Sequence, residues 1–463
     1  MLRDVDPIYQ EDVQRALNLL CCAKRPLLVE ELMLAIAVEL GDSPKYNSER
    51  QLKSSEDLRQ ICAGFIDIDV RTHDDLTLIN QVDSLSMMDI TLFGTHGTRY
   101  EMVRIAHFSV QEFLKSDRIR SKDFKDLVSF HVDMQDANDQ MAGTCLAFLL
   151  EPSILEAQMS ESSPLALNTL RTYAARHWVD YYDDFTSSAS TRAQASRLFC
   201  GAGGWFEKWL WYWDHDRNHP RKPRPGPLYY ASLLGIRSVV YKLIEDGLSK
   251  ELDASSNAYS RVEPFFLDEV AGNYGTALQA ASMRGHLAIV QRLIEGGANI
   301  NQQSGHYGTA LQLAADGCHL EIVHLLVTKG ADVNQQAGDD ETTALQAASL
   351  RGQLGMVQFL LENGANINQG CGYYGTALQA ASTGDHCDVV QFLIENGAHV
   401  NQEAGRHFGT ALQAAIRFNR PEIARLLLKE GAEAIQISAN ELKHLCFMLM
   451  RLRSINTESS GKT

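Results

Sequence analysis

The sequence is poor in the features that mark secreted and membrane proteins. Its nine cysteines are scattered along 463 residues, and no two of them have the Cys-x-x-Cys spacing. An odd number of scattered thiols favours a reducing compartment over a disulfide framework or a structural zinc site. Glu30, Glu31 and Glu39 interrupt the longest apolar candidate, and the first residues lack the apolar core of a signal peptide. We therefore expect a soluble cytoplasmic protein, with the nucleus left open, and no membrane partner.

Positive charge and catalytic motifs are also scarce. The chain has 42 Lys and Arg against 58 Asp and Glu, a net charge of −16, which argues against binding to a phosphate backbone. The sequence shows neither a Ser/His/Asp or Cys/His nucleophile motif nor a G-x-x-x-x-G-K-[ST] phosphate loop. The final Gly461-Lys462-Thr463 imitates the end of such a loop, but Asn456 stands where its first glycine belongs. The sequence predicts no enzyme, no cofactor, no metal and no nucleic-acid partner.

What the chain does have is one phrase written five times. YGTALQAAS occupies 274–282 and returns at 374–382, with close variants at 307–315, 342–349 and 408–416. Its threonine recurs after 33, 34, 33 and 34 residues, at Thr276, Thr309, Thr343, Thr376 and Thr410. A fixed period near 33 residues indicates a stacked repeat rather than a catalytic motif.

Each copy is predicted to form two short helices and an extended finger. The hydroxyl of Thr276 can accept a backbone N–H of the first helical turn, and Gly285 suits the left-handed turn that ends this helix. Apolar residues at 288–294 form a second helix, which Gly296-Gly297 ends. One such unit cannot bury its apolar face alone, so neighbouring units must stack.

This unit resembles the ankyrin repeat, whose family phrase is T-P-L-H-x-A-A, then G-H, then L-L-x-x-G-A. The matching letters are Thr276-Ala-Leu-Gln-Ala-Ala, Gly285-His286 and Leu293-Ile-Glu-Gly-Gly-Ala298. Alanine replaces the family's proline, which gives up some preorganisation of the first helical turn. Gln279 replaces the family's histidine, and because it can donate and accept, we expect it to bridge neighbouring repeats.

The turn glycine is replaced in three copies, by Cys318, Asp385 and Asn419. Asn and Asp tolerate the left-handed region better than most residues, whereas Gly317 beside Cys318 predicts a turn shifted by one residue. A sixth, degenerate copy at 227–247 precedes the five clear ones. Terminal repeats of a solenoid are usually atypical.

The N-terminal part has the pattern of a winged helix. Helices are expected at 10–23, 28–40 and 55–63, and strands that alternate apolar and polar residues at 65–70 and 100–106. The polar stretch 71–99 reads as a long insertion at the tip of the hairpin formed by these strands. The second strand runs into a helix that starts at His107, with Ser109 as its N-cap and Glu112 three residues later.

This half resembles the winged-helix module that follows the NACHT nucleotide-binding domain in fungal NLR-like (STAND) proteins. The resemblance rests on Lys24-Arg-Pro-Leu-Leu-Val-Glu-Glu-Leu and on Arg104-Ile-Ala-His-Phe-Ser-Val-Gln-Glu-Phe-Leu. Residues 115–213 resemble the helical connector of the same proteins, including its Trp-rich end, and Pro227-Leu-Tyr-Tyr-Ala-Ser-Leu-Leu-Gly is characteristic of that lineage. The NACHT domain itself is missing.

Together these patterns predict a mainly α fold, a winged-helix and helical N-terminal half followed by an ankyrin-repeat solenoid. The predicted divisions are 1–120, a winged-helix-like module with a long hairpin insertion; 121–213, a helical connector; 214–226, a Pro-rich basic linker; 227–434, one degenerate and five clear ankyrin repeats; and 435–463, a capping helix and tail.

Three features of this half allow both a plain and a functional interpretation. His107 occupies the position from which NLR winged helices contact bound ADP, yet Phe108 replaces the usual Asp, so a nucleotide contact would need a domain from another chain. The alternative is a histidine that satisfies backbone groups. The aromatic residues at 205–213 form either a binding platform or core. Two histidines at 215 and 219 could ligate metal, but the prolines that follow favour a linker.

The ankyrin surface is the more natural place for function, because residues that differ between copies at exposed positions can encode a partner. The candidate partner-binding residues lie at fingertips and at the ends of first helices: Met283, Arg284, His306, Asp339, Asp340, Glu341, Leu350, Arg351, Tyr373, Arg406, His407, Arg417 and Phe418.

The sequence therefore predicts a non-catalytic interaction protein that resembles an NLR without its nucleotide switch. It would bind a protein through the ankyrin face, while the winged-helix half docks on a NACHT-bearing chain or packs internally. Two alternatives stay open: a stand-alone ankyrin adaptor that tethers a client protein, and a fragment of a NACHT NTPase receptor in non-self recognition or cell death.

Overall fold

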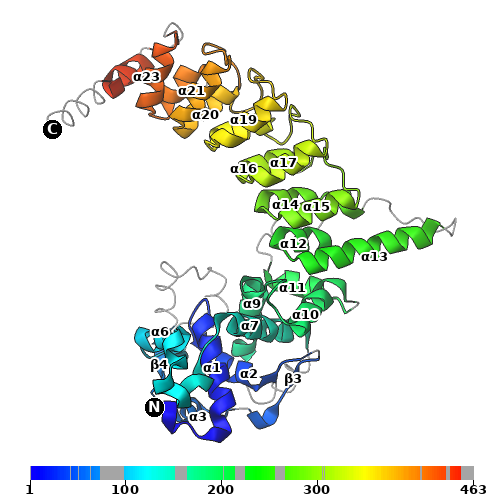
Figure 1. Ribbon diagram of the computed structural model, residues 1–463, viewed down its shortest axis with the longest axis vertical. Coiled ribbons are helices and arrows are strands. Elements are labelled where there is room, and N and C mark those ends of the chain that lie inside the picture. Colours follow the sequence, from blue (N-terminus) through cyan, green and yellow to red (C-terminus); the bar gives the residue numbers. More distant parts are fainter. Residues whose placement is uncertain are drawn as a thin grey trace. The chain divides into compact units, whose positions relative to one another are not determined.

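The computed structural model divides into two compact units, Met1–Pro220 and Arg221–Thr463, each of which is described by itself (Figure 1). The described residues are 2–41, 43–50, 52–62, 64–72, 99–151, 164–201, 203–213, 225–255, 266–304, 306, 308–406, 409–433, 438 and 440–449. The mainly α expectation is confirmed, since strands occur in this part of the chain only within the first unit.

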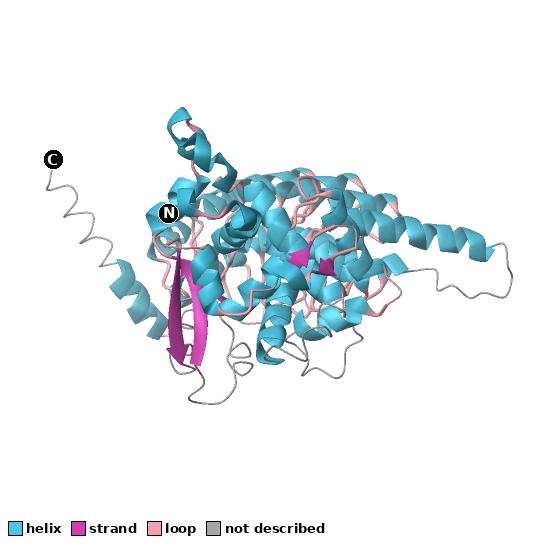
Figure 2. Ribbon diagram, turned by 90° about the horizontal axis from the view of Figure 1, so that it is seen from below, coloured by secondary structure: helices cyan, strands magenta, loops and turns pink. Residues whose placement is uncertain are grey.

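The first unit begins with a winged helix. Its regular elements are α1 (Gln10–Cys22), β1 (Leu27–Leu28), α2 (Val29–Ala37), β2 (Val38–Glu39), β3 (Lys45–Tyr46), α3 (Ser55–Ile61), β4 (Ile66–Thr72), β5 (Arg99–Ile105) and α6 (Phe108–Lys115). β4 and β5 form the long antiparallel hairpin drawn in magenta in Figure 2, and β1 adds to the other side of β5. The side chains of Leu17, Leu32 and Leu58 from the three helices are fully buried, so the three helices share one core.

Two parts of this module differ from the sequence expectation. The second helix begins at Val29 and ends at Ala37, rather than spanning 28–40, because short strands flank it. Leu27 and Leu28 pair with Val103 and Met102 of β5, and Val38 pairs with Tyr46 of β3. Strands of two residues have no period of their own, so only their distant partners define them.

The N-cap of α6 is also different. His107 Nδ1 accepts a hydrogen bond from the backbone N–H of Ser109 at 3.1 Å and lies 2.7 Å from its hydroxyl. The predicted cap at Ser109 is therefore wrong, since this residue already lies within the first helical turn and donates to the cap. The histidine satisfies one of the N–H groups that every helix start leaves open.

Helices α7 (Met134–Leu150), α9 (Pro164–Tyr181), α10 (Ala189–Cys200) and α11 (Trp205–Trp213) complete the first unit. Within the aromatic segment, Trp209 is fully buried and its indole N–H donates to the Ala175 carbonyl at 2.9 Å. Its ring lies 5.4 Å from that of Phe199, centroid to centroid. Trp211, by contrast, is 58% exposed. The segment thus packs through Trp209 and keeps one tryptophan at the surface.

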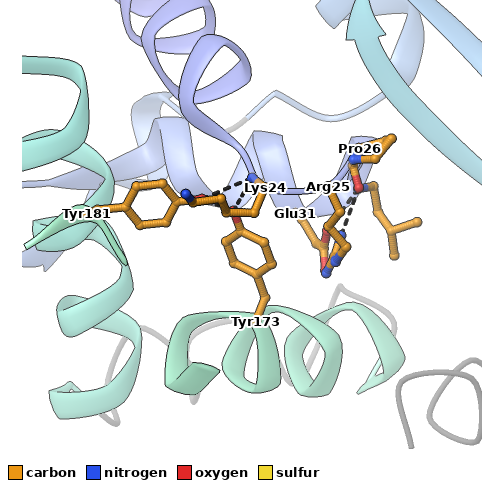
Figure 3. Close-up of polar contacts among 7 residues, drawn as sticks. Lys24, Arg25, Pro26, Glu31, Tyr173 and Tyr181 are labelled. Atoms are coloured by element: carbon orange, nitrogen blue, oxygen red, sulfur yellow. Dashed lines mark hydrogen bonds and ion pairs between the residues drawn. The ribbon is translucent and has the colours of Figure 1, made fainter. Parts of the chain in front are cut away.

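The turn after α1 ties the winged helix to α9 (Figure 3). The backbone N–H of Lys24 donates to the hydroxyls of Tyr173 and Tyr181, at 3.1 and 3.0 Å. Arg25 reaches Glu31 through two hydrogen bonds of 2.8 Å, and the Glu31 carboxylate also accepts the Leu28 N–H at 2.9 Å. The Glu31 side chain is 0% exposed, so this ion pair is buried and has its hydrogen bonds in place.

The second unit is a stack of helix pairs. The pairs are α12 (Pro227–Leu234) with α13 (Arg237–Ser255), α14 (Ala277–Arg284) with α15 (Leu287–Glu295), α16 (Ala310–Asp316) with α17 (Leu320–Thr328), α18 (Ala344–Leu350) with α19 (Leu354–Glu362), α20 (Ala377–Gly384) with α21 (Cys387–Glu395), and α22 (Ala411–Arg417) with α23 (Pro421–Lys429). Figure 1 shows them following one another in sequence order. Small first-helix residues such as Ala280 and Ala314 are fully buried, which lets neighbouring helices approach closely.

The turns between paired helices correct one expectation. Cys318 itself adopts the left-handed conformation, with φ 63°, and Gly317 stays at −74°, so the predicted shift onto the glycine is wrong. Asp385 and Asn419 also have positive φ values, of 69° and 56°. The stacked repeats fix the length of each turn, and the residue at this site takes the strained conformation whatever its type.

No helix in the described part of the chain combines the length and apolarity needed to cross a bilayer. Over the same residues, no group of three or more His, Cys, Asp or Glu side chains is placed to hold a metal ion. The segment with the predicted histidine pair, 214–219, lies outside the described residues, as do 73–98 of the hairpin insertion and the tail 451–463.

Candidate partner-binding face of the repeats

The glutamine of the repeated phrase fixes each first helix to the finger of the next repeat. Gln346 Oε1 accepts the Thr343 N–H at 2.8 Å, while the Thr343 hydroxyl accepts the Gln346 N–H at 3.3 Å. The Gln346 amide N–H group donates to the Gly375 carbonyl of the following finger. Gln279, Gln312 and Gln379 make the same bridge. The expected role of Gln279 is thus confirmed.

A second set of bridges comes from asparagines at the base of the fingers. Asn334 Nδ2 donates to the Gly364 carbonyl at 2.9 Å, and its Oδ1 accepts the Asn366 N–H at 2.8 Å. Asn301 and Asn368 repeat the pattern one unit earlier and later. Because these bonds join each finger to the next at its base, the fingers keep a constant spacing.

A third set joins the turns. His319 Nε2 lies 3.1 Å from the Met283 carbonyl of the preceding repeat, and His386 Nε2 lies 3.0 Å from that of Leu350. His286 contacts the Leu233 carbonyl at 3.3 Å, and burial lowers its pKa below the ordinary value. The carbonyl groups at the ends of these first helices therefore contact the histidine of the following repeat and help to hold the stack together.

The fingertips are linked to one another through their backbones. We number the tips by repeat: second (304–308), third (337–342), fourth (371–375) and fifth (404–409). The Asp339 N–H donates to the His306 carbonyl at 2.9 Å, Tyr373 to Asp340 at 3.1 Å, and Arg406 to Gly372 at 3.0 Å. A Cβ at Gly372 would collide with the Asp340 carbonyl oxygen, so the close approach of the third and fourth tips requires glycine.

Charged side chains cross-link the same tips. Arg406 Nη2 lies 2.8 Å from Glu341 Oε2, although the two residues belong to tips two repeats apart. His306 Nδ1 contacts the Asp339 carboxylate. At the ends of the first helices, rather than at the tips, Arg351 lies 2.8 Å from Asp316. Exposed ion pairs of this kind contribute little stability, so their main effect is to hold the charges in position.

The predicted residues do not all converge. The structure brings His306, Asp339, Asp340, Glu341, Tyr373 and Arg406 together at tips two to five, as the backbone and ion-pair contacts show. Arg351 lies at the end of α18, where it contacts Asp316. Met283 and Leu350 are half-buried, and their carbonyls contact the histidines described above.

The remaining candidates lie at the two ends of the array. Arg284 is exposed in the first clear repeat, while Arg417 and Phe418 are exposed in the last. Beside the latter two, Asn419 Oδ1 lies 3.4 Å from Nε2 of His444, in a helical segment at 440–449. His407 lies outside the described residues.

Sequence reasoning missed two members of this surface, Asp316 and Tyr374. Asp316 stands seven residues after Thr309, the same offset at which Met283 follows Thr276, so aligning the copies would have found it. Burial raises the pKa of Tyr374, and the neighbouring carboxylates of Asp340 and Asp316 add to the effect. Tyr374 is thus coupled electrostatically to Asp340 of the third tip and to Asp316 at the end of α16.

The comparisons with known proteins agree with the two-part organisation. The family model for ankyrin repeats (3 copies) matches residues 228–337 and 345–438. The model for the GPI inositol-deacylase winged helix domain matches residues 6–82. Among solved structures, the chain is similar to the human ASB11 ankyrin repeat domain, with 28% identity, 47% of this chain and 88% of that chain covered, and a TM-score of 0.37.

One curated relative is the azaphilone pigments biosynthesis cluster protein L of Monascus ruber. It is 34% identical over 65% of this chain, and the match spans 58% of the relative's own length. Two regions of the chain are thereby identified: an N-terminal winged helix of the GPI inositol-deacylase type and a C-terminal array of ankyrin repeats.

Proposed function

We propose that this chain is a non-catalytic regulatory protein that holds a protein partner on the tips of its ankyrin array. One observation carries the proposal. Tips two to five are joined by backbone hydrogen bonds of 2.9 to 3.1 Å, while the side chains that they present differ from copy to copy and stay exposed. A rigid framework with variable exposed side chains suits recognition of a folded protein or an extended peptide, because little entropy is lost on binding.

The winged-helix half suits a packing role within the same protein. The exposed part of α3 carries Glu56 and Arg59, which form an ion pair of 3.4 Å, and so offers no excess of positive charge to a nucleic acid. The neighbouring hairpin pairs Asp67 with Arg104 at 3.0 Å. We propose that this half docks on another protein chain, one with a NACHT domain, or packs internally.

We further propose that the whole chain is NLR-like and that it is located in the cytoplasm. We also propose that it has five parts, divided at residues 120, 213, 226 and 434. The two matched regions and the order of modules in the sequence support the NLR-like nature, while the location and the boundaries rest on the sequence patterns alone. A stand-alone ankyrin adaptor is the alternative that shares the same binding face.

The proposal is tested by comparing proteins captured by the wild-type chain and by a fourfold variant, Asp339→Ala, Asp340→Ala, Arg406→Ala and Arg417→Ala. All four side chains are exposed, so the variant should fold normally and show an unchanged circular dichroism spectrum. We expect it to lose a discrete cellular protein that the wild type retains. Gln291→Ala, on the exposed side of α15, serves as the control and should retain the protein. Equal capture by all three chains would count against this face.

A further inference from the structure

One charged side chain at the third tip, Asp340, forms no ion pair with any residue that the structure describes. Asp339 contacts His306, Glu341 pairs with Arg406, and Arg351 pairs with Asp316. In the sequence, Asp340 lies between Asp339 and Glu341, whose charges are both paired, and it is exposed. Over the residues that the structure describes, its carboxylate has neither an ion pair nor a hydrogen bond, since only its backbone carbonyl is engaged, by Tyr373.

Asp340 is adjacent to two tyrosines of the fourth tip. Tyr373 and Tyr374 have ring centroids 5.1 Å apart at an interplanar angle of 75°, and Tyr373 is 37% exposed. The hydrogen bond from the Tyr373 N–H to the Asp340 carbonyl, 3.1 Å long, holds the backbones of these two residues side by side. The Asp340 charge also contributes to the raised pKa of Tyr374, after burial. Gly372 makes this approach possible, as described above.

A free carboxylate next to an exposed ring selects for a cation. The carboxylate can accept two parallel N–H bonds from a guanidinium, and the negative face of the ring attracts the same planar group. Arginine fits both better than lysine, whose ammonium is a compact and strongly hydrated charge. An acidic group would instead meet Asp340 as a like charge.

We propose that Asp340 and Tyr373 receive a basic side chain, arginine foremost, from the protein segment bound at the tips. This inference rests on the proposed function and specifies the chemistry of the partner. Among the tips that the structure describes, an unpaired carboxylate next to an exposed tyrosine occurs where the third tip meets the fourth. The position is central in the array, so a segment lying across the tips would cross it.

The test uses a library of random 12-residue peptides displayed on phage and selected on the full-length chain. We expect peptides selected by the wild type to carry Arg, or less often Lys, at one preferred position. For such a peptide, Asp340→Asn should weaken binding about fivefold, as for a charge-assisted pair at a surface. Tyr373→Ala should weaken it about threefold, whereas Tyr373→Phe should bind as well as the wild type, because the ring rather than the hydroxyl attracts the cation.

Asp339→Asn is the matched control, since it removes the same charge from the adjacent residue, whose carboxylate already contacts His306. It should weaken binding less than Asp340→Asn does. Selected peptides that lack a basic residue, or that bind Asp340→Asn as well as the wild type, would overturn this inference. If such peptides did not bind the fourfold variant, the proposed function would stand. Peptides insensitive to both variants, or no selected peptide at all, would count against both.

Discussion

Truncating the bridging glutamine of the central repeat should weaken the interface between this repeat and the next. In Gln346→Ala, the Thr343 N–H loses its 2.8 Å acceptor, at a site that is 1% exposed. The Gly375 carbonyl loses the glutamine donor but keeps the Cys371 N–H, at 3.2 Å. A buried N–H left without a partner costs about 1 to 3 kcal/mol, and the hydrogen bond lost at Gly375 costs about 0.5 to 1.5 kcal/mol. The lost methylene adds about 0.8 kcal/mol of burial. We therefore expect the free energy of unfolding of the array to fall by about 3 kcal/mol.

The measurement is urea denaturation of the full-length chain, combined with hydrogen exchange read by mass spectrometry on peptides from α18 and α20. With a slope of about 2 to 3 kcal/mol per molar urea, the array's midpoint should fall by about 1 to 1.5 M. Exchange should accelerate on both sides of the lost bridge, because the interfaces between adjacent repeats determine the stability of such stacks. Peptides from the first unit should exchange as in the wild type.

Two further variants separate the hydrogen bonds from the loss of volume. Gln346→His carries the residue typical of ankyrin repeats, which can accept on one ring nitrogen and donate on the other, and should lose only about 1 kcal/mol. Gln291→Ala removes an exposed amide that contacts Glu295 at 2.9 Å and should change stability by less than about 0.5 kcal/mol. If Gln346→Ala cost no more than Gln291→Ala, or if Gln346→His were as damaging as alanine, the bridge would not hold the repeats together.

Three other changes have definite expected outcomes. Cys318→Gly should raise the urea midpoint of the array, because relief of a left-handed strain of about 1 to 2 kcal/mol exceeds the entropic cost of glycine, about 0.5 to 1 kcal/mol; an unchanged or lower midpoint would contradict this. Glu31→Gln should destabilise the first unit by about 3 to 5 kcal/mol, because Arg25 remains buried without its counter-charge; a thermal melt within a degree of the wild type would refute it. His286→Gln, the residue found at the equivalent position 353, should weaken the pH dependence of stability below pH 6.5. Burial lowers the folded-state pKa of His286, so its protonation favours the unfolded chain; stability is full above the ordinary value of about 6.5 and is lost as the pH falls through the lower folded-state pKa. Urea midpoints at pH 7.5 and 5.5 would show it, and equal pH dependence in the variant would exclude the histidine as the source.

The elements with a local period were predictable from sequence. The phrase around Thr276 predicted the caps, the helix pairs and the bridging role of Gln279, because capping residues and apolar spacing act within a few residues of one another. The hairpin of β4 and β5 was predictable for the same reason.

The features that depend on distant contacts were not predictable. The two-residue strand β1 exists only because β5, more than 70 residues later, pairs with it. Cys318 accepts a strained turn that the stack imposes. At the candidate site, aligning the five copies was enough to predict the exposure of most single residues. The pairing of Arg406 with Glu341, 65 residues apart, required the stack itself.

The most direct test of the proposed binding face is photo-crosslinking in living cells. A benzophenone amino acid would replace Tyr373 at the fourth tip in one chain and Gln291 on the outer side of α15 in another. If the fingertips hold a protein partner, the chain labelled at 373 should give a discrete crosslinked band of higher mass, and the chain labelled at 291 should not. No band from 373, or the same band from both positions, would contradict a partner-binding role for this face.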